Sequence, residues 1–551
     1  MPQLSRRHFA QASLGALLVG CAPRSTPDLI IHGGPIYTGA AATPVEALRV
    51  SNGVFAVVGS LADARANARG VREIDLGGAA AFPGFTDAHV HLTGVGAAAL
   101  SLDLVGVTSI SDLQQRLHTY AAAHTDGPIY GRGWIETHWP EDRFPNSADL
   151  DSIVSDRPVF LERVDGHAAV VNSAALRLAQ IGSNTANPPG GSIERDGSGA
   201  ATGMLIDNAM RLVQSRFPPP TEAMIREALQ QGARLYASRG WTGVHNMSTS
   251  LVEARFFQEL AASGDLPLSA DIYLTPEDSD GILETGPYGD GAVKVRGVKM
   301  YMDGALGSRG AVLLAPYSDA RSSSGLLVTP PEQIAAMIQR AKAKNVQVTT
   351  HAIGDRGNRL VLNAYRDAYA DNPEALRNAR YRIEHAQILA TEDIPRFAAQ
   401  GVIASMQPSH AISDLYFAPS RLGPDRLAGA YAWRALLDSG ATIAGGTDAP
   451  VEKGDPLVEF YAATYRHDLS GFAGPDWHLE QVVTRTEALR MFTSAAAFAT
   501  FSENERGVIE VGKRANVTAF SVDLMTAEPS AIPTATAKLS IADGRVTHET
   551  L

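Results

Sequence analysis

The sequence predicts an α/β fold: a (β/α)8 TIM barrel with a large insertion after its first strand, plus a small β-sandwich domain built from both termini. Eight short stretches rich in β-branched residues alternate with helical stretches through the middle of the chain. The first and second of these stretches are separated by roughly 150 residues, far more than a loop requires. Both ends of the chain read as short strands separated by glycine turns.

The N-terminal segment resembles an export signal and is not expected to join the folded domains. The pair Arg6-Arg7 precedes an apolar run from Ala10 to Val19, and this run leads into Leu-Val-Gly-Cys21. The arginine pair resembles a twin-arginine signal, and the last four residues resemble a bacterial lipobox. We therefore expect residues 1–21 to hold a signal peptide cleaved before Cys21. A chance match and ordinary secretion of an unfolded chain are the alternatives.

This interpretation predicts a location for the mature protein. A lipid on Cys21 would hold it at a bacterial cell envelope, exported to the periplasmic side, and would be its single link to the membrane. Whether that membrane is the inner or the outer one does not follow from the sequence.

Residues 28–82 and 500–551 contain the β-rich segments of the two ends. Apolar runs at 29–31, 47–50 and 54–58 are separated by glycine turns, and the C-terminal tail has the same character. Two small β-rich segments at opposite ends of a chain are most simply explained if their strands pair with each other. We therefore expect one composite β-sandwich domain beside the barrel.

Residues 83–499 are expected to form the barrel, with an inserted subdomain at about 100–220. Helical stretches at 331–344 and 357–370 lie between candidate strands, as βα units require. The candidate strands are 82–88, 241–246, 269–274, 296–302, 346–351, 380–385, 401–407 and 441–447.

Composition excludes several classes of protein. The 551 residues include 47 Lys and Arg against 59 Asp and Glu, a formal net charge of −12, so the chain offers no basic surface for nucleic acid. Its single cysteine, Cys21, rules out an intramolecular disulfide and thiolate metal ligands. Any metal must be bound by His, Asp, Glu or Lys.

Polar residues occupy the C-terminal ends of the candidate strands, where barrel enzymes carry their catalytic groups. The first strand ends in His89-Val90-His91, and because residues two apart in a strand project to the same side, both imidazoles can bind one ion. Singly, each such residue has an ordinary structural explanation, but their joint placement predicts a metal site at one mouth. The other members are Lys299, His351, His385 and Asp448.

Further stretches of the sequence extend this pattern beyond His89 to His91. They are 163–168, 303–309, 351–355, 382–387 and 405–408. With these stretches the chain resembles the amidohydrolase superfamily, and within it the amidohydrolase family 3 branch of YtcJ-like and N-substituted formamide deformylase-like proteins, over nearly the whole mature chain. The branch commonly has Ser-Asp at the eighth strand, where this chain has Thr447-Asp448.

The resemblance implies a divalent metal, with zinc as the first expectation and manganese, iron or cobalt as alternatives. Lys299 would be carboxylated and bridge two ions; the alternative is an unmodified ammonium that binds a substrate carboxylate, which leaves one ion or two open. Asp448 would also serve as the catalytic base and acid, taking a proton from the attacking water and passing it to the leaving nitrogen. The implied ligands are His89, His91, Lys299, His351, His385 and Asp448.

Four residues in the family-like phrases are expected to contact substrate: His167, Asp303, Arg309 and Gln407. For Asp303 and Arg309 the alternative is a mutual pair that fixes a loop. His245 ends the second strand, and a hydrogen bond inside the barrel and a contact with substrate are its two alternatives. His410 follows the seventh strand, and its role is likewise undecided.

The sequence thus predicts a metal-dependent amidohydrolase that cleaves amide-type C–N bonds in small N-acyl or N-formyl amine or amino acid-like substrates. Hydrolysis of cyclic amides, esters or lactones is an alternative, because the same water attacks any suitably placed carbonyl. A catalytically silent binding lipoprotein of the cell envelope is an alternative of another class. Neither the substrate nor the oligomeric state is predicted.

Overall fold

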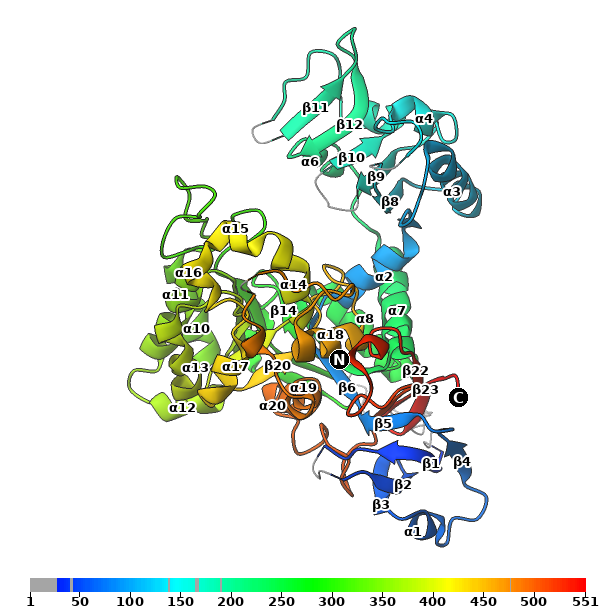
Figure 1. Ribbon diagram of the computed structural model, residues 1–551, viewed down its shortest axis with the longest axis vertical. Helices are drawn as coiled ribbons and strands as arrows, with labels where there is room; N and C mark the ends of the chain where they lie inside the picture. The colour runs from blue at the N-terminus through cyan, green and yellow to red at the C-terminus, as the bar shows by residue number, and fades with distance from the viewer. Residues whose placement is uncertain (1–26, 40–42, 137–138, 164–167, 189–190, 476) are drawn as a thin grey trace, which may run out of the picture.

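The computed structural model describes residues 27–551 apart from 40–42, 137–138, 164–167, 189–190 and 476. Within these residues the strands form three sheets of eight, six and nine strands, and each sheet belongs to a different part of the molecule (Figure 1). No helix in this part of the chain is long and apolar enough to cross a bilayer. Cys21 and the expected signal peptide lie outside the described residues.

The nine-stranded sheet is the barrel. Eight of its strands run parallel, and short β15 (Tyr288–Asp290) pairs antiparallel with the fourth. Every predicted barrel strand overlaps an observed one, so the prediction of a TIM-type barrel is confirmed. In barrel order the strands are β6 (Phe85–Val90), β13 (Trp241–Thr249), β14 (Ser269–Leu274), β16 (Val293–Tyr301), β17 (Gln347–Ala352), β18 (Arg382–His385), β19 (Ile403–Met406) and β20 (Ile443–Gly445).

The last strand returns to the first and nearly closes the barrel. Beyond the end of β20 the Asp448 N–H donates to the His89 carbonyl at 2.7 Å, and the His91 N–H donates to the Ala449 carbonyl at 2.9 Å. Gly446 permits this approach, because a Cβ there would lie 2.5 Å from the His89 nitrogen. The chain following the eighth strand is thereby fixed against the His-Val-His segment.

Helices surround the barrel, and the predicted helices 331–344 and 357–370 correspond to α10 and α11 (Figure 1). Apolar residues at helical spacing, such as Val361, Leu362 and Tyr365 of α11, are buried against the sheet. The helices of this part are α2 (Leu92–Leu100), α7 (Glu222–Arg239), α8 (Leu251–Ser263), α9 (Asp280–Thr285), α10 (Pro331–Lys342), α11 (Asp355–Ala368), α12 (Pro373–Ala379), α13 (Ile394–Gln400), α14 (Pro408–Ser413), α15 (Ala418–Leu422), α16 (Pro424–Leu427), α17 (Trp433–Asp438), α18 (Pro456–Tyr465), α19 (Arg485–Met491) and α20 (Ser494–Ala499).

The eight-stranded sheet joins the two ends of the chain. Its order is β23-β22-β21-β5-β1-β2-β3, with β4 paired to β1, and the antiparallel pair β5–β21 connects N-terminal and C-terminal strands. That these strands also form the two layers of a sandwich stays a prediction. The elements are β1 (Leu29–Ile36), β2 (Val45–Ser51), β3 (Val54–Gly59), α1 (Leu61–Arg65), β4 (Arg72–Asp75), β5 (Ala80–Pro83), β21 (Val517–Phe520), β22 (Ala537–Ala542) and β23 (Arg545–Glu549).

The six-stranded sheet lies in the segment between the first and second barrel strands, and Figure 1 shows it above the barrel, reached through α2 and α7. Those two helices touch closely, since a Cβ on Gly96 would lie 1.6 Å from the Ala228 carbonyl oxygen. The sheet order is β11-β12-β10-β9-β8-β7. The elements are β7 (Leu102–Asp103), α3 (Ile110–Ala123), β8 (Ile129–Trp134), α4 (Ser147–Asp151), β9 (Val159–Arg163), β10 (Ala168–Val171), α5 (Ser173–Leu178), β11 (Gly191–Arg195), β12 (Ala201–Asp207) and α6 (Met210–Gln214).

Candidate metal centre

The C-terminal ends of the barrel strands surround a cavity of about 380 Å³. The six residues expected to bind metal come from β6 and the residue that follows it, from β16, β17 and β18, and from the segment after β20, and all six line this cavity. They are His89, His91, Lys299, His351, His385 and Asp448. Residues up to 359 positions apart therefore meet as the strand-end pattern predicted.

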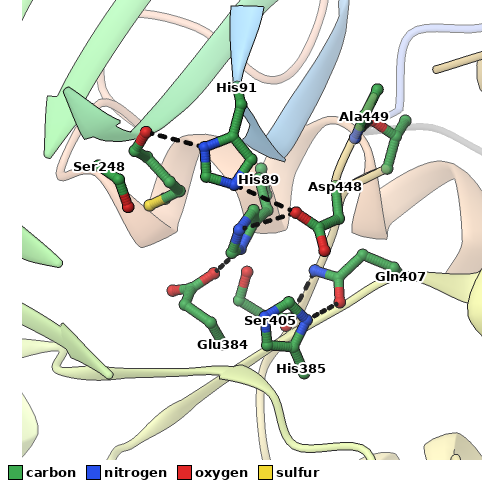
Figure 2. A network of polar contacts seen from close by, with 12 residues as sticks. His89, His91, Ser248, Glu384, His385, Ser405, Gln407, Asp448 and Ala449 are labelled. Atoms are coloured by element: carbon green, nitrogen blue, oxygen red, sulfur yellow. Dashed lines mark hydrogen bonds and ion pairs between the residues drawn. The ribbon is translucent and has the colours of Figure 1, made fainter. Parts of the chain in front are cut away.

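Three of these residues approach one another most closely. One ligand atom each from His89, His385 and Asp448 lies within 4.8 Å of the other two, and all three side chains are buried. Asp448 Oδ1 is 3.4 Å from Nε2 of His89 and 3.3 Å from Nε2 of His91 (Figure 2). His351 and Lys299 line the same cavity but do not belong to this tight group.

Three imidazoles of the centre have a hydrogen-bond acceptor at Nδ1. His89 donates to Glu384 Oε2 at 2.6 Å, and His385 donates to Gln407 Oε1 at 2.8 Å (Figure 2). His91 Nδ1 donates to the Met247 carbonyl at 3.1 Å. An acceptor at Nδ1 fixes the proton there and leaves the Nε2 lone pair free, which is the tautomer that a metal ligand requires.

Burial keeps these imidazoles neutral. It lowers the pKa of His89 to about 4 and that of His351 to about 3, and the charge of Lys299 lowers both further. Burial alone would raise the pKa of Asp448, but the neighbouring imidazoles, His89 first, hold it well below its usual range. At neutral pH the centre therefore offers uncharged nitrogen ligands and an ionised carboxylate, the donor set that suits a divalent metal.

Two buried nitrogen atoms in the cavity wall support this fit. Nε2 of His351 and Nε2 of His410 have no hydrogen-bond partner in the described part of the chain. A buried polar atom without a partner is costly in a folded protein unless a ligand satisfies it.

Lys299 is also unusual. Its side chain is 1% exposed, its ammonium lies 5.1 Å from the centre of the Tyr301 ring, and it makes no hydrogen bond or ion pair among the described residues. Burial lowers its pKa to about 8, which increases the neutral amine fraction at physiological pH.

The backbone at two members of the centre adopts an uncommon conformation. His385 has φ 75° and Asp448 has φ 57°, both in the left-handed region that residues other than glycine seldom occupy. Such strain is typical of functional positions, where the surrounding structure imposes it.

A buried ionic network lies behind His89. Glu384, which is fully buried, accepts from Arg382 Nε at 2.8 Å as well as from His89. Arg382 also donates to His245 Nδ1 at 2.9 Å, which places the undecided His245 inside the barrel and away from the cavity wall. Sequence reasoning missed Glu384, although its alternation with Arg382 along β18 puts both on the inward face.

The expected substrate contacts have other neighbours. Asp303 accepts from the backbone N–H groups of Val312, Ile353 and Gly354 at 2.8 to 2.9 Å and so fixes loops beside the cavity. Arg309 pairs with Asp319 at 2.9 Å, so the alternative pair between Asp303 and Arg309 does not form.

Gln407 orients His385 by accepting a hydrogen bond from its Nδ1. Asp303, Arg309 and Gln407 are therefore absent from the wall of the cavity among the described residues. His167, the fourth expected substrate contact, lies outside the described residues.

The rest of the wall comes from Tyr301 at the end of β16, from the segment around α14 and from loops; apart from His410, none of these residues was expected from the sequence. It combines apolar, aromatic and acidic side chains. Its members include Tyr301, Leu306, Ile353, Gln387, His410, Asp414, Phe417, Val451 and Glu452.

Comparison with known proteins gives the family. The family model described as "Amidohydrolase family" matches residues 72–548. This chain belongs to the amidohydrolase family. The family and the similarity to metal-dependent hydrolases show that the protein is a hydrolase. Its cluster of His89, His385 and Asp448 suits a divalent metal.

The relatives and a solved structure agree with this assignment. This amidohydrolase is 34% identical to YtcJ of Bacillus subtilis (strain 168) over 534 residues, covering 94% of this chain and 99% of that protein. It is 27% identical to the N-substituted formamide deformylase of Arthrobacter pascens over 493 residues, or 86% and 89% of the two chains. The crystal structure of an uncharacterized metal-dependent hydrolase from Pyrococcus furiosus matches with a TM-score of 0.75 and 30% identity, and the match covers 91% of this chain and 100% of that chain.

Proposed function

We propose that this amidohydrolase cleaves amide-type C–N bonds of N-acyl or N-formyl compounds with the help of a bound divalent metal. The observation that carries the proposal is the convergence of His89, His385 and Asp448 within 4.8 Å in the wall of an accessible cavity. The relative named N-substituted formamide deformylase supports the choice of bond.

The residues that would hold the metal are the six that line the cavity, and zinc is the ion we propose, since imidazole and carboxylate ligands suit it. When bound by these residues, zinc would supply Lewis-acid chemistry, lowering the pKa of a water towards about 7 and polarising a carbonyl. Equilibrium dialysis followed by elemental analysis tests this directly. Binding of less than one zinc per chain, with no other divalent metal in its place, contradicts the proposal.

Asp448 is the proposed proton carrier. Its carboxylate is held ionised, so it accepts the proton of the attacking water and passes it to the departing nitrogen. Burial keeps the imidazoles of His89 and His351 neutral, and the acceptors at Nδ1 of His89 and His385 leave their Nε2 atoms free for the metal. Asp448→Asn keeps the shape and removes the base, so we expect kcat to fall by about 100-fold or more.

Lys299 is the proposed site of carboxylation, which would bridge two ions. Carboxylation needs a neutral amine, and a buried lysine without a hydrogen-bond partner among the described residues meets that need. The test is the zinc content of Lys299→Ala with and without a short-chain carboxylic acid. Two ions in the wild type, fewer in the variant and recovery with the acid support the bridge. An unchanged count contradicts it and favours the ammonium that binds a substrate carboxylate.

Esters, lactones and cyclic amides present the same carbonyl, so hydrolysis of these compounds is the alternative activity, and a binding lipoprotein is the alternative of another class. A panel of N-formyl, N-acyl, cyclic amide and lactone compounds assayed with and without chelator separates them. Chelator-sensitive turnover of the open amides supports the proposal. Turnover of the esters or cyclic amides alone favours the alternative hydrolase, and stoichiometric metal without any turnover favours the binding protein.

We also propose that the protein is exported and anchored by lipid on Cys21 at the cell envelope. The support is the arginine pair followed by Leu-Val-Gly-Cys21 in the sequence. Metabolic labelling with a fatty acid should mark the wild type and leave Cys21→Ala unlabelled. Equal labelling of both contradicts the anchor.

A further inference from the structure

The part of the cavity away from the metal ligands is acidic and apolar. Asp414, at the start of the short 3-10 helix η2 (Asp414–Tyr416), and Glu452, which follows the eighth strand, both line it. Leu306, Phe417 and Val451 form its apolar wall. The described lining residues include no arginine, and their single lysine is Lys299, which we have assigned to the metal.

Neither carboxylate has an arginine or lysine partner in the described part of the chain. Glu452 accepts from the Ser413 hydroxyl at 2.6 Å, and Asp414 accepts through one oxygen from Gln387 and Tyr431. In the described part of the chain neither forms an ion pair, and the second oxygen of each has no hydrogen bond.

These groups lie towards the mouth of the cavity. Asp414 and Glu452 are half-buried, as His91 and His351 also are, whereas His89, His385 and Asp448 are buried, and Val451, next to Glu452, is 69% exposed. A substrate whose carbonyl reaches the metal ligands therefore extends its far end along the apolar wall towards the two carboxylates.

A second observation marks the same surface as a ligand contact. His410 is 8% exposed, it lines the cavity, and its Nε2 has no hydrogen-bond partner among the described residues. It lies 3.8 Å from Asp448 Oδ2 and one turn of chain before Asp414. The Nε2 atom of His410 thus lies between the metal ligands and the two carboxylates without a hydrogen-bond partner among the described residues, and a bound amide would supply one.

We propose that the site selects N-acyl derivatives of amines whose far end is apolar or cationic, and that Asp414 and Glu452 bind the cationic end and repel a carboxylate. The inference rests on the proposed amide hydrolysis and narrows it, because N-acyl amino acids with an exposed carboxylate become poor substrates. Two unpaired carboxylates in a partly desolvated wall disfavour an anionic group by simple Coulomb repulsion.

The test compares three substrates that differ only at the far end: the N-formyl derivatives of a linear alkylamine, of the matching α,ω-diamine and of the matching ω-amino acid. Assays at about pH 8 keep Asp414 ionised, since burial raises its pKa to about 6. We expect kcat/KM of the zinc-loaded enzyme to fall in the order diamine, alkylamine, amino acid derivative. The first and last should differ by about tenfold or more.

The matched variants are Glu452→Gln and Asp414→Asn, which remove a charge and keep the size of the side chain. Each should lower the ratio of kcat/KM for the diamine derivative to that for the alkylamine derivative. Glu332→Gln, an exposed change of equal charge on α10, should leave that ratio unchanged. A ratio unaffected by both cavity variants overturns the inference, as does equal or better turnover of the amino acid derivative.

Failure of the proposed function has a different signature. If the alkylamine derivative is not hydrolysed while zinc is bound, amide hydrolysis itself is wrong. Calorimetric binding of the three compounds to the zinc-loaded enzyme then still tests the selectivity. Tighter binding of the diamine derivative than of the amino acid derivative supports it, and equal or weaker binding overturns it.

Discussion

Replacement of Gln407 by leucine should weaken metal binding through His385 without touching the metal ligands. Gln407 Oε1 accepts from His385 Nδ1 at 2.8 Å, and the two side chains are 3% and 4% exposed. Water cannot replace the lost acceptor in so buried a place, so the imidazole loses both its preferred tautomer and its fixed orientation. Loss of such a partner lowers metal affinity by about 10- to 100-fold, which corresponds to about 1.4 to 2.8 kcal/mol.

The assay is competition for zinc between the protein and a chromogenic chelator, with the isosteric Gln407→Glu variant as control. Glutamate retains an acceptor for the imidazole N–H, so its zinc affinity should stay closer to that of the wild type. The leucine variant should also lose about 1 to 3 kcal/mol of folding stability in urea, because a buried N–H is left unpaired. Wild-type zinc affinity in the leucine variant, or an equal loss in both variants, would refute the role given to Gln407.

Three further predictions concern two buried glutamates and the bound metal. Glu384→Gln should destabilise the fold by about 3 to 5 kcal/mol in urea unfolding, because Arg382 keeps its charge inside the barrel without a partner; a loss below about 1 kcal/mol would contradict this. Removal of zinc by a chelator should abolish hydrolysis and lower stability by about 4 kcal/mol relative to zinc at 1,000 times its Kd. Calorimetry with zinc added back is the check, and an unchanged Tm in the chelated protein speaks against a bound ion. Burial raises the pKa of Glu459 well above its usual value. The folded protein therefore keeps this carboxyl neutral at pH values where the unfolded chain ionises it. The stability of the folded protein should fall as pH rises from the unfolded-state pKa to the folded-state pKa. Glu459→Gln should flatten that decline in urea unfolding as pH rises above the ordinary range of a glutamate, and the wild type should lose about 1.4 kcal/mol for each pH unit over which the carboxyl is protonated only in the folded state. An identical pH profile would show that Glu459 is not the cause.

The barrel and the meeting of the proposed metal ligands at one mouth could be predicted from the sequence because both depend on local patterns. Short β-branched runs identify strands, and the alternation in His89-Val90-His91 fixes which side chains share a face. Parallel strands then bring His351 and His385 to the same mouth, since Tyr301 pairs with His351 and Ala352 pairs with His385 across neighbouring strands.

The remainder of the site could not be predicted, because it depends on the direction in which loop side chains point. Asp303 and Arg309 stand in one family-like phrase, yet Asp303 turns inward to three backbone N–H groups while Arg309, at φ 58°, turns outward to Asp319. Asp414 and Glu452 reach the cavity from loops after different strands. No periodicity in the sequence relates such loops to each other.

The orientation of the imidazoles shows how the barrel interior and the metal centre depend on each other. The acceptors for Nδ1 come from three different strands or their ends: Met247 on β13, Glu384 on β18 and Gln407 after β19. Glu384 can be a buried anion at this place only because Arg382 lies beside it, and Arg382 in turn is held by Ser405 at 2.8 Å and by the Ala88 carbonyl at 2.6 Å. A polar network therefore replaces part of the apolar filling usual in such barrels. Arg382 does not line the cavity, but it holds Glu384, and Glu384 in turn fixes the ring of His89. A substitution that removes a hydrogen bond of Arg382 should therefore alter the orientation of His89 and weaken metal binding.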